Sequence, residues 1–310
     1  MGIVLKIMVT KREGYRLDGL ILKGIGGFYY VETADKIVEC KAKGIFRQKK
    51  LSPLVGDRVS ICVDMNGKGL IEEIKPRKNE FLRPPLANLD QLFLVVSSCE
   101  PEPNLFVIDK LLTIAEYKGI QSLIVLTKED LKRDETVAKV YRHAGYQVLS
   151  VSNIGTKSGK VLLPYLEGKI TALTGNTGVG KSSLLNSMME GLNLETSHIS
   201  QKLGRGRHTT RHVELYQVEG KSGTYVADTP GFSTVELNQY DIILKDKLQY
   251  CFREFEPFLG KCKFTGCSHT AEKGCAVLEA LNRGEIEPSR HQSYVQLYEA
   301  AKQIKEWELK

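Results

Sequence analysis

The chain has 310 residues, of which 42% are hydrophobic and 26% are charged. This ordinary globular composition excludes a disordered or fibrous chain and leaves room for two or three domains. No run approaches the ~18 to 20 apolar residues of a membrane span, and seven cysteines without an export signal favour reduced thiols or metal ligands over disulfides. We therefore expect a cytoplasmic protein with no membrane partner.

The net charge of +7 is concentrated in the first quarter of the chain. Residues 1–85 hold 17 Lys and Arg against 10 Asp and Glu, whereas residues 86–310 hold 27 of each sign. A basic N-terminal module favours a polyanionic partner, because each neutralised phosphate releases counterions. A lysine-rich solvated surface would give the same charge pattern.

Short β-rich runs separated by turns occupy residues 17–75, including 27–32, 37–40 and 58–63. Strands of this length and spacing, together with the basic excess, predict an N-terminal all-β OB-type barrel, a fold that binds nucleic acid on an open strand face. An SH3-like barrel would have a similar sequence pattern. The proline-rich, basic stretch 76–85 predicts a linker out of this barrel.

From about residue 88 the pattern changes to buried strands that alternate with helices. Strands are predicted at 92–96, 122–126 and 147–150, and helices at 105–117 and 135–143. Near-continuous apolar strands of this kind are typical of a parallel sheet covered on both faces. The sequence therefore predicts a central α/β domain.

A phosphate-binding loop follows the predicted strand 170–174. The motif Gly-x-x-x-x-Gly-Lys-Ser at 175–182 lies between this strand and a helix, as a P-loop requires. Its glycines let backbone N–H groups surround a phosphate chain, while Lys181 would reach the β and γ oxygens and Ser182 would supply a hydroxyl to Mg²⁺. The predicted nucleotide-binding residues here are Gly175, Asn176, Thr177, Gly178, Val179, Gly180, Lys181, Ser182 and Ser183.

A P-loop alone does not distinguish ATP from GTP, but the motif Thr-Lys-Glu-Asp at 127–130 does. Asp130 can accept hydrogen bonds from N1–H and the exocyclic amine of guanine, and adenine offers no matching donors. Lys128 would lie along the base and ribose. At another strand end, 150–152 fits the short loop whose backbone N–H supports the guanine O6. The predicted base-binding residues are Thr127, Lys128, Glu129, Asp130, Ser150, Val151 and Ser152.

An Asp-Thr-Pro-Gly motif at 228–231 follows the predicted strand 225–227 and completes the phosphate end of the site. Asp228 would hold Mg²⁺ through a water, and the N–H of Gly231 would sense the γ-phosphate. An ordinary Thr-Pro-Gly turn would have the same residues.

The basic, glycine-rich stretch 202–212 between these motifs cannot form a core, so we expect a ligand or partner to order it. Either Thr209 or Thr210 is the expected switch-I ligand of Mg²⁺ and the γ-phosphate, and we prefer Thr210. The guanine motifs precede the P-loop, whereas ordinary small GTPases have the reverse order. The sequence therefore predicts a circularly permuted G domain.

Three cysteines and one histidine lie within fourteen residues near the C-terminus. Their spacing, Cys-x₄-Cys-x-His-x₅-Cys, supplies four protein ligands, which predicts one closed structural Zn²⁺ site rather than a catalytic one. Free thiols and a redox site are the alternatives. The predicted ligands are Cys262, Cys267, His269 and Cys275.

The chain ends in a predicted amphipathic helix from about Ser289. One face of it carries an apolar stripe, which indicates core packing more often than a partner site. The stripe consists of Tyr294, Leu297, Tyr298, Ala301 and Ile304.

The sequence resembles the RsgA (YjeQ/YloQ) GTPases in three features. It has a basic barrel, then Thr-Lys-x-Asp ahead of Gly-Asn-Thr-Gly-Val-Gly-Lys-Ser, and then the Cys/His module. The resemblance includes the stretches 83–85 and 87–91 and covers nearly the whole chain, apart from residues 1–12. It implies a bacterial factor that binds the small (30S) ribosomal subunit late in assembly. Members hydrolyse GTP slowly alone and faster when docked, and their OB barrel and zinc module contact ribosomal RNA.

Hydrolysis requires a water oriented for in-line attack. Many GTPases use a Gln directly after Asp-x-x-Gly, but this chain has Phe232 there, which can neither donate nor accept a hydrogen bond. The resemblance and the local chemistry both favour His208 as the residue that orients the water. As alternatives, His208 is a solvated loop residue or an RNA contact. The predicted catalytic residues are His208, Lys181 and Thr210.

We therefore expect a monomeric GTP hydrolase stimulated by the small ribosomal subunit, with Mg²⁺ and one Zn²⁺. The expected domains are an OB-type barrel at 1–78, a permuted α/β G domain at 79–240, and a helical zinc-binding domain at 241–310. One alternative is a GTPase of RNA modification or translation, which would need a second catalytic site. The other is a nucleic-acid-binding module whose nucleotide site is only structural.

Overall fold

The computed structural model describes residues 14–48, 51–81, 84–131, 135–151, 159–188, 213–228 and 242–304. The predicted site residues Ser152, His208, Thr209, Thr210 and Gly231 lie outside these ranges. The chain divides into two compact units. The first comprises the described residues up to Leu89 and those within 168–172 and 206–230, and the second comprises the rest.

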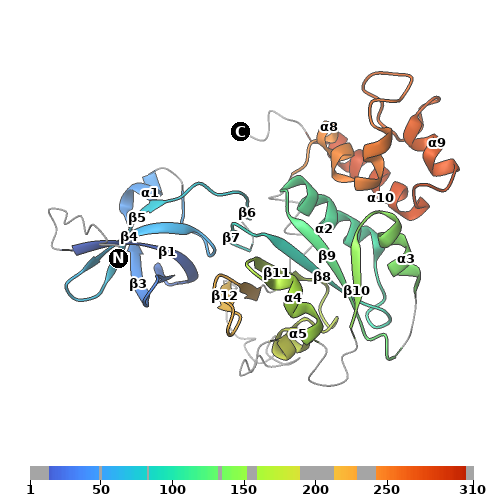
Figure 1. Cartoon of the computed structure of the whole chain (residues 1–310). Helices are drawn as coiled ribbons and strands as arrows, with labels where there is room; N and C mark the ends of the chain where they lie inside the picture. The colour runs from blue at the N-terminus through green and yellow to red at the C-terminus, as the bar shows by residue number, and fades with distance from the viewer. Residues whose placement is uncertain are drawn as a thin grey trace, which may run out of the picture. The chain divides into compact units, whose positions relative to one another are not determined.

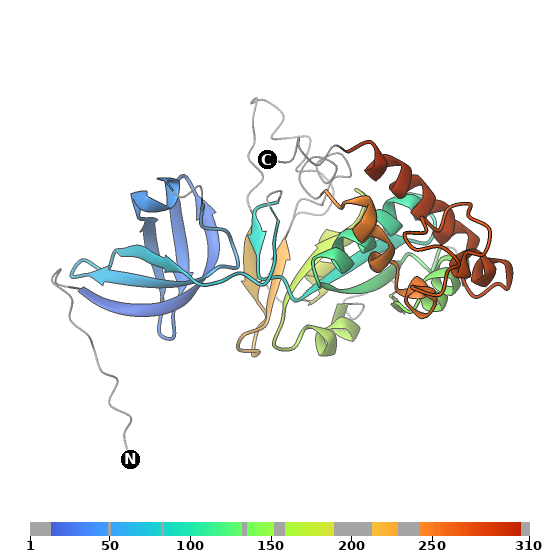
Figure 2. The same ribbon diagram turned by 90° about the horizontal axis from the view of Figure 1, so that it is seen from above.

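The first unit contains a closed barrel of strands β1 to β5, drawn in blue in Figures 1 and 2. The strand order is β1-β2-β3-β5-β4, and β4 pairs back onto β1. Strands β3 and β5 are parallel, and the other neighbours are antiparallel. This connectivity is that of the OB-type barrel, so the prediction of an N-terminal barrel is confirmed. The elements are β1 (Gly14–Ile25), β2 (Phe28–Glu32), β3 (Ile37–Ala42), α1 (Gly44–Gln48), β4 (Arg58–Asp64) and β5 (Gly69–Ile74).

Alternating burial explains why these segments form strands. In β3, Val38 and Cys40 are buried while Ile37, Glu39 and Lys41 are exposed, which is the period of two expected for a half-buried strand. Gly69 of β5 leaves room for the Cys40 side chain, because a Cβ at Gly69 would lie 2.2 Å from the Cys40 Sγ. The barrel core is formed by Ile21, Val31, Val38, Cys40, Phe46, Val59, Ile61, Val63 and Ile71.

The proline-rich stretch expected to be a linker is instead tied to the barrel. It forms a small hairpin of β6 (Glu80–Phe81) and β7 (Leu86–Ala87). Arg77 donates from Nε to Asp57 Oδ1 at 2.7 Å and from Nη2 to Asp57 Oδ2 at 2.7 Å, and Asp57 is fully buried. Asn88 Nδ2 donates to the carbonyl of Gly56 at 2.9 Å. The linker prediction was therefore wrong, because side chains distant in sequence fix this segment.

The first unit also includes a strand pair from the C-terminal half of the chain. The strands β12 (Glu214–Gln217) and β13 (Tyr225–Asp228) form an antiparallel hairpin, and β13 pairs in parallel with β11 (Ile170–Thr174). The barrel strand β1 pairs with β12 through Lys23 and Glu214, whose side chains form an ion pair of 2.8 Å. The hydroxyl of Tyr225 donates to Glu32 of β2.

The second unit is built on a parallel sheet in the order β10-β9-β8. Its strands β8 (Gln91–Ser97) and β9 (Gln121–Thr127) are almost entirely buried, as expected for a sheet covered on both faces. The helix α2 (Leu105–Tyr117) begins at Asn104, whose side chain accepts a hydrogen bond from the Val107 N–H at 3.2 Å. The remaining elements are α3 (Glu135–His143), β10 (Gln147–Ser150), η1 (Gly159–Leu162), α4 (Leu163–Leu166) and α5 (Lys181–Met188).

The C-terminal part of the second unit is made of short helices and a loop. Its long helix α10 (Pro288–Lys302) packs against α2, as the red and green ribbons of Figure 1 show. Tyr294 of α10 is buried against Phe252 and Phe255, with ring centroids 5.2 and 4.8 Å apart. The other elements are α8 (Lys245–Leu248), η2 (Gln249–Cys251), η3 (Arg253–Phe258) and α9 (Ala276–Asn282).

A buried polar network fastens α10 to the parallel sheet domain. Arg290 donates to Glu254 from Nε at 2.6 Å and from Nη2 at 3.1 Å. The hydroxyl of Tyr141, from α3, donates to Asp109 of α2 at 2.8 Å. Burial lowers the pKa of the Arg290 guanidinium, but the charges and hydrogen bonds of Glu254 and Asp109 outweigh burial and raise it overall.

None of the described helices is both long enough and apolar enough to cross a bilayer.

Candidate nucleotide and metal sites

The P-loop begins at a close approach between two backbones. Gly175 follows β11 with φ of 144°, and a Cβ there would lie 2.1 Å from the carbonyl oxygen of Val95, at the end of β8. Only glycine fits this position. Gly178 and Gly180 have φ of 83° and 97°, so the loop curls through conformations that other residues rarely adopt.

The lysine of the P-loop motif begins the helix that follows the loop. Lys181 is the first residue of α5, and its Nζ donates to the carbonyls of Gly175 and Asn176, at 2.8 Å each. The ammonium group therefore lies across the loop whose backbone would surround a phosphate chain. Ser182 and Ser183 occupy the first turn of α5, where the N–H groups and the helix dipole favour an anion.

The predicted guanine motif contacts the P-loop directly. Thr127, the last residue of β9, donates from Oγ1 to the carbonyl of Val179 at 2.6 Å, and both residues are buried. Lys128 follows with φ of 61°, and its Nζ donates to the carbonyl of Glu100. Asp130 is exposed in the turn after the strand. The structure therefore brings the predicted base-binding and phosphate-binding segments together.

The third predicted element of the nucleotide site ends the neighbouring strand. Ser150 of β10 is in register with Leu126 of β9, and the N–H of Val151 donates to the carbonyl of Leu126 at 2.8 Å. This places the 150–151 backbone at the same edge of the sheet as the Thr-Lys-Glu-Asp motif. Asp228 is the final residue of β13, in register with Glu214 of β12.

One part of this site was missed by sequence reasoning. The segment after β8, which carries Pro101 and Pro103, lines a small pocket together with Gly175, Asn176 and Val179 of the P-loop. Its Glu100 carbonyl accepts the Lys128 ammonium. Two prolines shortly after a buried strand were the available signal, because proline restricts the backbone of the connection to α2.

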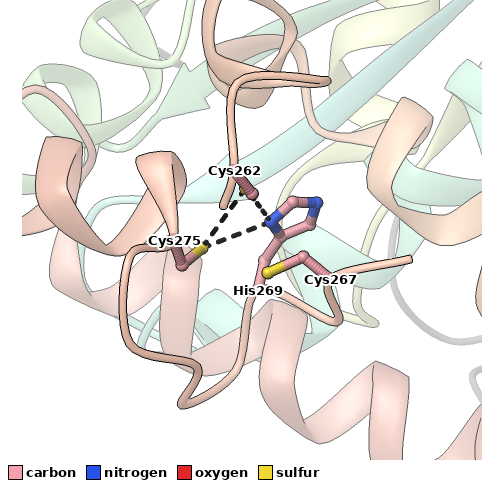
Figure 3. A group of neighbouring side chains, drawn as sticks. All are labelled: Cys262, Cys267, His269 and Cys275. Carbon is pink, nitrogen blue, oxygen red and sulfur yellow. Dashed lines mark hydrogen bonds between the residues drawn. The ribbon is translucent and has the colours of Figure 1, made fainter. Parts of the chain in front are cut away.

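The four predicted zinc ligands form a compact cluster in the second unit (Figure 3). Their ligand atoms lie within 4.8 Å of one another. The Sγ atoms of Cys262 and Cys275 are 3.9 Å apart, and His269 Nδ1 lies 3.5 and 3.3 Å from them. A tetrahedral ion with Zn–S bonds of ~2.3 Å would separate two sulfur ligands by about 3.8 Å. The donor set of Cys262, Cys267, His269 and Cys275 therefore fits a zinc ion.

Surrounding side chains orient the histidine ligand. His269 Nε2 lies 2.8 Å from Gln249 Oε1, which can only accept, so Nε2 carries the proton and Nδ1 is left for a metal. Burial lowers the pKa of His269, which favours the neutral imidazole that binds zinc. His291 Nε2 lies 2.8 Å from the carbonyl of His269, and the hydroxyl of Tyr294 donates to the carbonyl of Ser268 at 2.8 Å.

A partly buried carboxylate closes the loop between the second and fourth ligands. The N–H groups of Ser268, Thr270 and Ala271 donate to Glu272 at 2.7, 3.1 and 3.2 Å. Burial alone would raise the pKa of Glu272, but these hydrogen bonds and that of the Ser268 hydroxyl lower it to about 2. Glu272 is therefore ionised at neutral pH and holds the loop together.

A P-loop tied to a Thr-Lys-x-Asp motif that precedes it in the chain defines a circularly permuted P-loop GTPase. Comparison with known families agrees: the RsgA GTPase model matches residues 74–238, and the RsgA N-terminal domain model matches 18–71. The chain belongs to the RsgA GTPase family. It is a GTP hydrolase, as predicted, and the resemblance inferred from its motifs is confirmed.

Curated relatives match almost end to end. The small ribosomal subunit biogenesis GTPase RsgA of Ruminiclostridium cellulolyticum is 45% identical over 295 residues, covering 93% of this chain and 95% of the relative. The protein of the same name from Geobacillus thermodenitrificans is 43% identical over 294 residues, covering 93% and 98%.

Two solved structures share the fold. YjeQ from Thermotoga maritima superposes with a TM-score of 0.79 at 34% identity, covering 94% of this chain and 100% of its own. YloQ, described as a circularly permuted GTPase, gives a TM-score of 0.77 at 34% identity, covering 96% and 98%. The predicted fold class, with its barrel, permuted G domain and C-terminal Cys/His module, is therefore confirmed.

Proposed function

We propose that this protein binds the small ribosomal subunit and uses GTP hydrolysis in the late assembly of that subunit. The observation that carries this proposal is the match of both modules, barrel and GTPase, to a family whose curated relatives are named for small-subunit biogenesis. The functional domains are the barrel at 1–78, the G domain at 79–240 and the zinc-binding domain at 241–310. The protein acts as a monomer in the cytoplasm.

The nucleotide site binds GTP and GDP with Mg²⁺. Lys181 contacts the β- and γ-phosphates, Ser182 and Thr210 bind Mg²⁺, and Asp130 reads the guanine base. The contact of Thr127 with Val179 supports this assignment, because it fixes the base-reading edge against the phosphate loop. The remaining nucleotide contacts are assigned to the loop 175–183, the motifs 127–130 and 150–152, Thr209, Asp228 and Gly231.

One structural Zn²⁺ is held by the cluster of Cys262, Cys267, His269 and Cys275. Four protein ligands leave no open position for a reacting water, so the ion stabilises the loop rather than taking part in catalysis. The interligand distances and the proton on His269 Nε2 support this assignment.

The barrel contacts ribosomal RNA through aromatic rings paired with lysines. The Lys36 ammonium lies 5.8 Å from the Tyr15 ring centroid, and the Lys41 ammonium lies 4.9 Å from that of Phe28. Rings that stack on bases beside cations that meet phosphates are the two components of single-stranded RNA binding. The basic excess of residues 1–85 supports the same assignment.

The zinc-binding domain presents a similar pair at its surface. Phe264 is 55% exposed, and the Lys263 ammonium lies 5.5 Å from its ring centroid. Both residues belong to the loop between the first two zinc ligands, so the metal would hold this pair in place for RNA.

The test is the GTP hydrolysis rate of the protein alone and with small subunits, large subunits or free RNA. We expect a large increase with small subunits only, and its loss in Lys181→Ala. The proposal would be overturned if no particle raised the hydrolysis rate and if RNA binding did not depend on nucleotide. The protein would then be a binding module whose nucleotide site is structural.

His208 is assigned the orientation of the attacking water in the docked state. His208→Ala should retain GTP affinity and lose the subunit-stimulated turnover, whereas His143→Ala, which alters an exposed histidine of α3, should retain both. Normal stimulated turnover in His208→Ala would refute the assignment.

A further inference from the structure

An apolar groove lies within the second unit between α2, α8 and α10. Its volume is about 340 Å³, which is within the range of pockets that accept a large organic group, from roughly 300 Å³ upward. Leu297 and Ile304 are only partly buried, so the groove exposes apolar surface to its surroundings. Its main apolar walls are Phe106, Ile114, Ile243, Leu297, Ala300 and Ile304.

The chain itself continues from the wall of this groove. Ile304 is the last described residue before 305–310, whose sequence is Lys-Glu-Trp-Glu-Leu-Lys. The groove is lined at this end by Leu297, Ala300 and Ala301 of α10 and by Ile304 just beyond the helix, and Trp307 is the next apolar residue in the chain. Three residues span at most about 10 Å, so Trp307 cannot lie far from the groove.

We propose that the groove between α2, α8 and α10 is the docking site of the chain's own segment 305–310, with the indole of Trp307 seated in it. Trp307 carries the largest apolar side chain of the segment, and burying an aromatic ring removes ~150 to 250 Å² of surface from water. Because the segment is tethered at the wall of the groove, it occupies the groove ahead of a free partner of equal intrinsic affinity.

Charge also suits this occupant. Among the described lining residues, Lys110 is the charged one, and burial lowers the pKa of its ammonium. Glu306 and Glu308 flank Trp307, so insertion of the indole brings a carboxylate toward Lys110. An approaching carboxylate favours the charged form of a lysine and offsets the effect of burial.

Tryptophan emission tests this proposal, since Trp307 is the chain's single tryptophan. We expect the emission of the native protein to be blue-shifted and several-fold less quenched by acrylamide than that of the denatured chain. Leu297→Gln should shift the emission to the red and restore quenching. Ala300→Gln should do the same, and because Ala300 is exposed this variant keeps the fold.

The matched control is Val161→Gln, which alters a 56% exposed apolar residue that does not line the groove. It should leave emission and quenching as in the unaltered protein. All variants should retain GTP affinity, which shows that they are folded and separates this proposal from the proposed function.

Three outcomes would overturn the proposal. Equal quenching in the native and denatured states would show that the indole is in water. Shielding that survives both Leu297→Gln and Ala300→Gln would place the indole elsewhere. An emission shift that disappears on dilution would mean that the groove holds the segment of a second copy.

Discussion

Arg290 of α10 and Asp109 of α2 form an ion pair of 2.8 Å in which both side chains are fully buried. The two residues are 181 positions apart in the chain. The contact joins the C-terminal helical module to the helix that follows the first strand of the parallel sheet. The planar guanidinium also holds both oxygens of Glu254, so one side chain fixes two acidic partners.

Replacement of this arginine should strongly destabilise the protein. In Arg290→Met two carboxylates remain buried without their cation, and such a loss costs about 3 to 5 kcal/mol. Urea unfolding would measure it. Arg283→Met is the control, since Arg283 pairs with Glu285 at the surface, where solvent screens the charges and such pairs add little stability. Equal stability of the two variants would contradict the prediction.

The hydrogen bond between the two halves of the nucleotide site should be measurable in GTP affinity. Thr127→Val removes the hydroxyl that donates to Val179 and leaves a buried carbonyl unpaired, so we expect GTP to bind about tenfold more weakly. Titration with a fluorescent guanine nucleotide would show this. Thr113→Val also removes a buried hydroxyl, which donates to the carbonyl of Asp109 within α2, and should leave affinity intact. A similar loss in both variants would mean that the effect is one of general stability.

Adding one methyl group at the start of the P-loop should weaken nucleotide binding. In Gly175→Ala the new Cβ meets the Val95 carbonyl, so we expect GTP affinity to fall by at least about tenfold, or ~1.4 kcal/mol. Gly168→Ala serves as the control, because Gly168 has φ of 69° but nothing within 4 Å of its Cβ position. Its backbone strain should lower stability without changing GTP affinity. Unaltered GTP binding by Gly175→Ala would refute the close approach.

The metal cluster predicts one zinc ion per chain by elemental analysis. Removal of zinc by a chelator, or the substitution Cys275→Ser, should lower the melting temperature and expose the loop 262–275 to protease. Cys62→Ser alters a cysteine outside the cluster and should retain the metal. A protein that holds no zinc after purification under reducing conditions would contradict this expectation.

Two other cysteines should resist alkylation. Burial raises the pKa of the Cys40 and Cys251 thiols to about 12, from an ordinary value of 9.0. The folded protein holds these protons more tightly than the unfolded chain, so the thiols contribute stability below pH 9 that is lost as the pH rises toward 12. At pH 8, iodoacetamide followed by mass spectrometry should modify the partly exposed Cys62 and Cys99 first. Equal alkylation rates for the four cysteines would contradict the burial of Cys40 and Cys251.

Sequence patterns predicted most of the secondary structure, because burial follows local periodicity. The helix predicted at about 105–117 and the strand predicted at 170–174 agree with α2 and β11. The motif residues of the P-loop and zinc cluster could be found because their chemistry requires fixed spacing. The structure brings these predicted residues together as the motifs require.

Contacts between distant residues could not be predicted in this way. Residues 76–85 have the composition of a linker, but Arg77 binds the buried Asp57. Arg290 is a charged residue on an amphipathic helix, a pattern that indicates solvent exposure, and its acidic partner lies on α2. Both surprises depend on partners far away in the chain, which local periodicity does not report.

The order of synthesis gives the contact between Thr127 and Val179 a further consequence. The base-reading edge leaves the ribosome first, and the Val179 carbonyl that the Thr127 hydroxyl contacts is translated 52 residues later. A GTPase of the usual order makes its phosphate loop at the beginning and its base-reading edge near the end. In this nascent chain the order is reversed, so the base-reading edge is made first and the phosphate loop completes the contact.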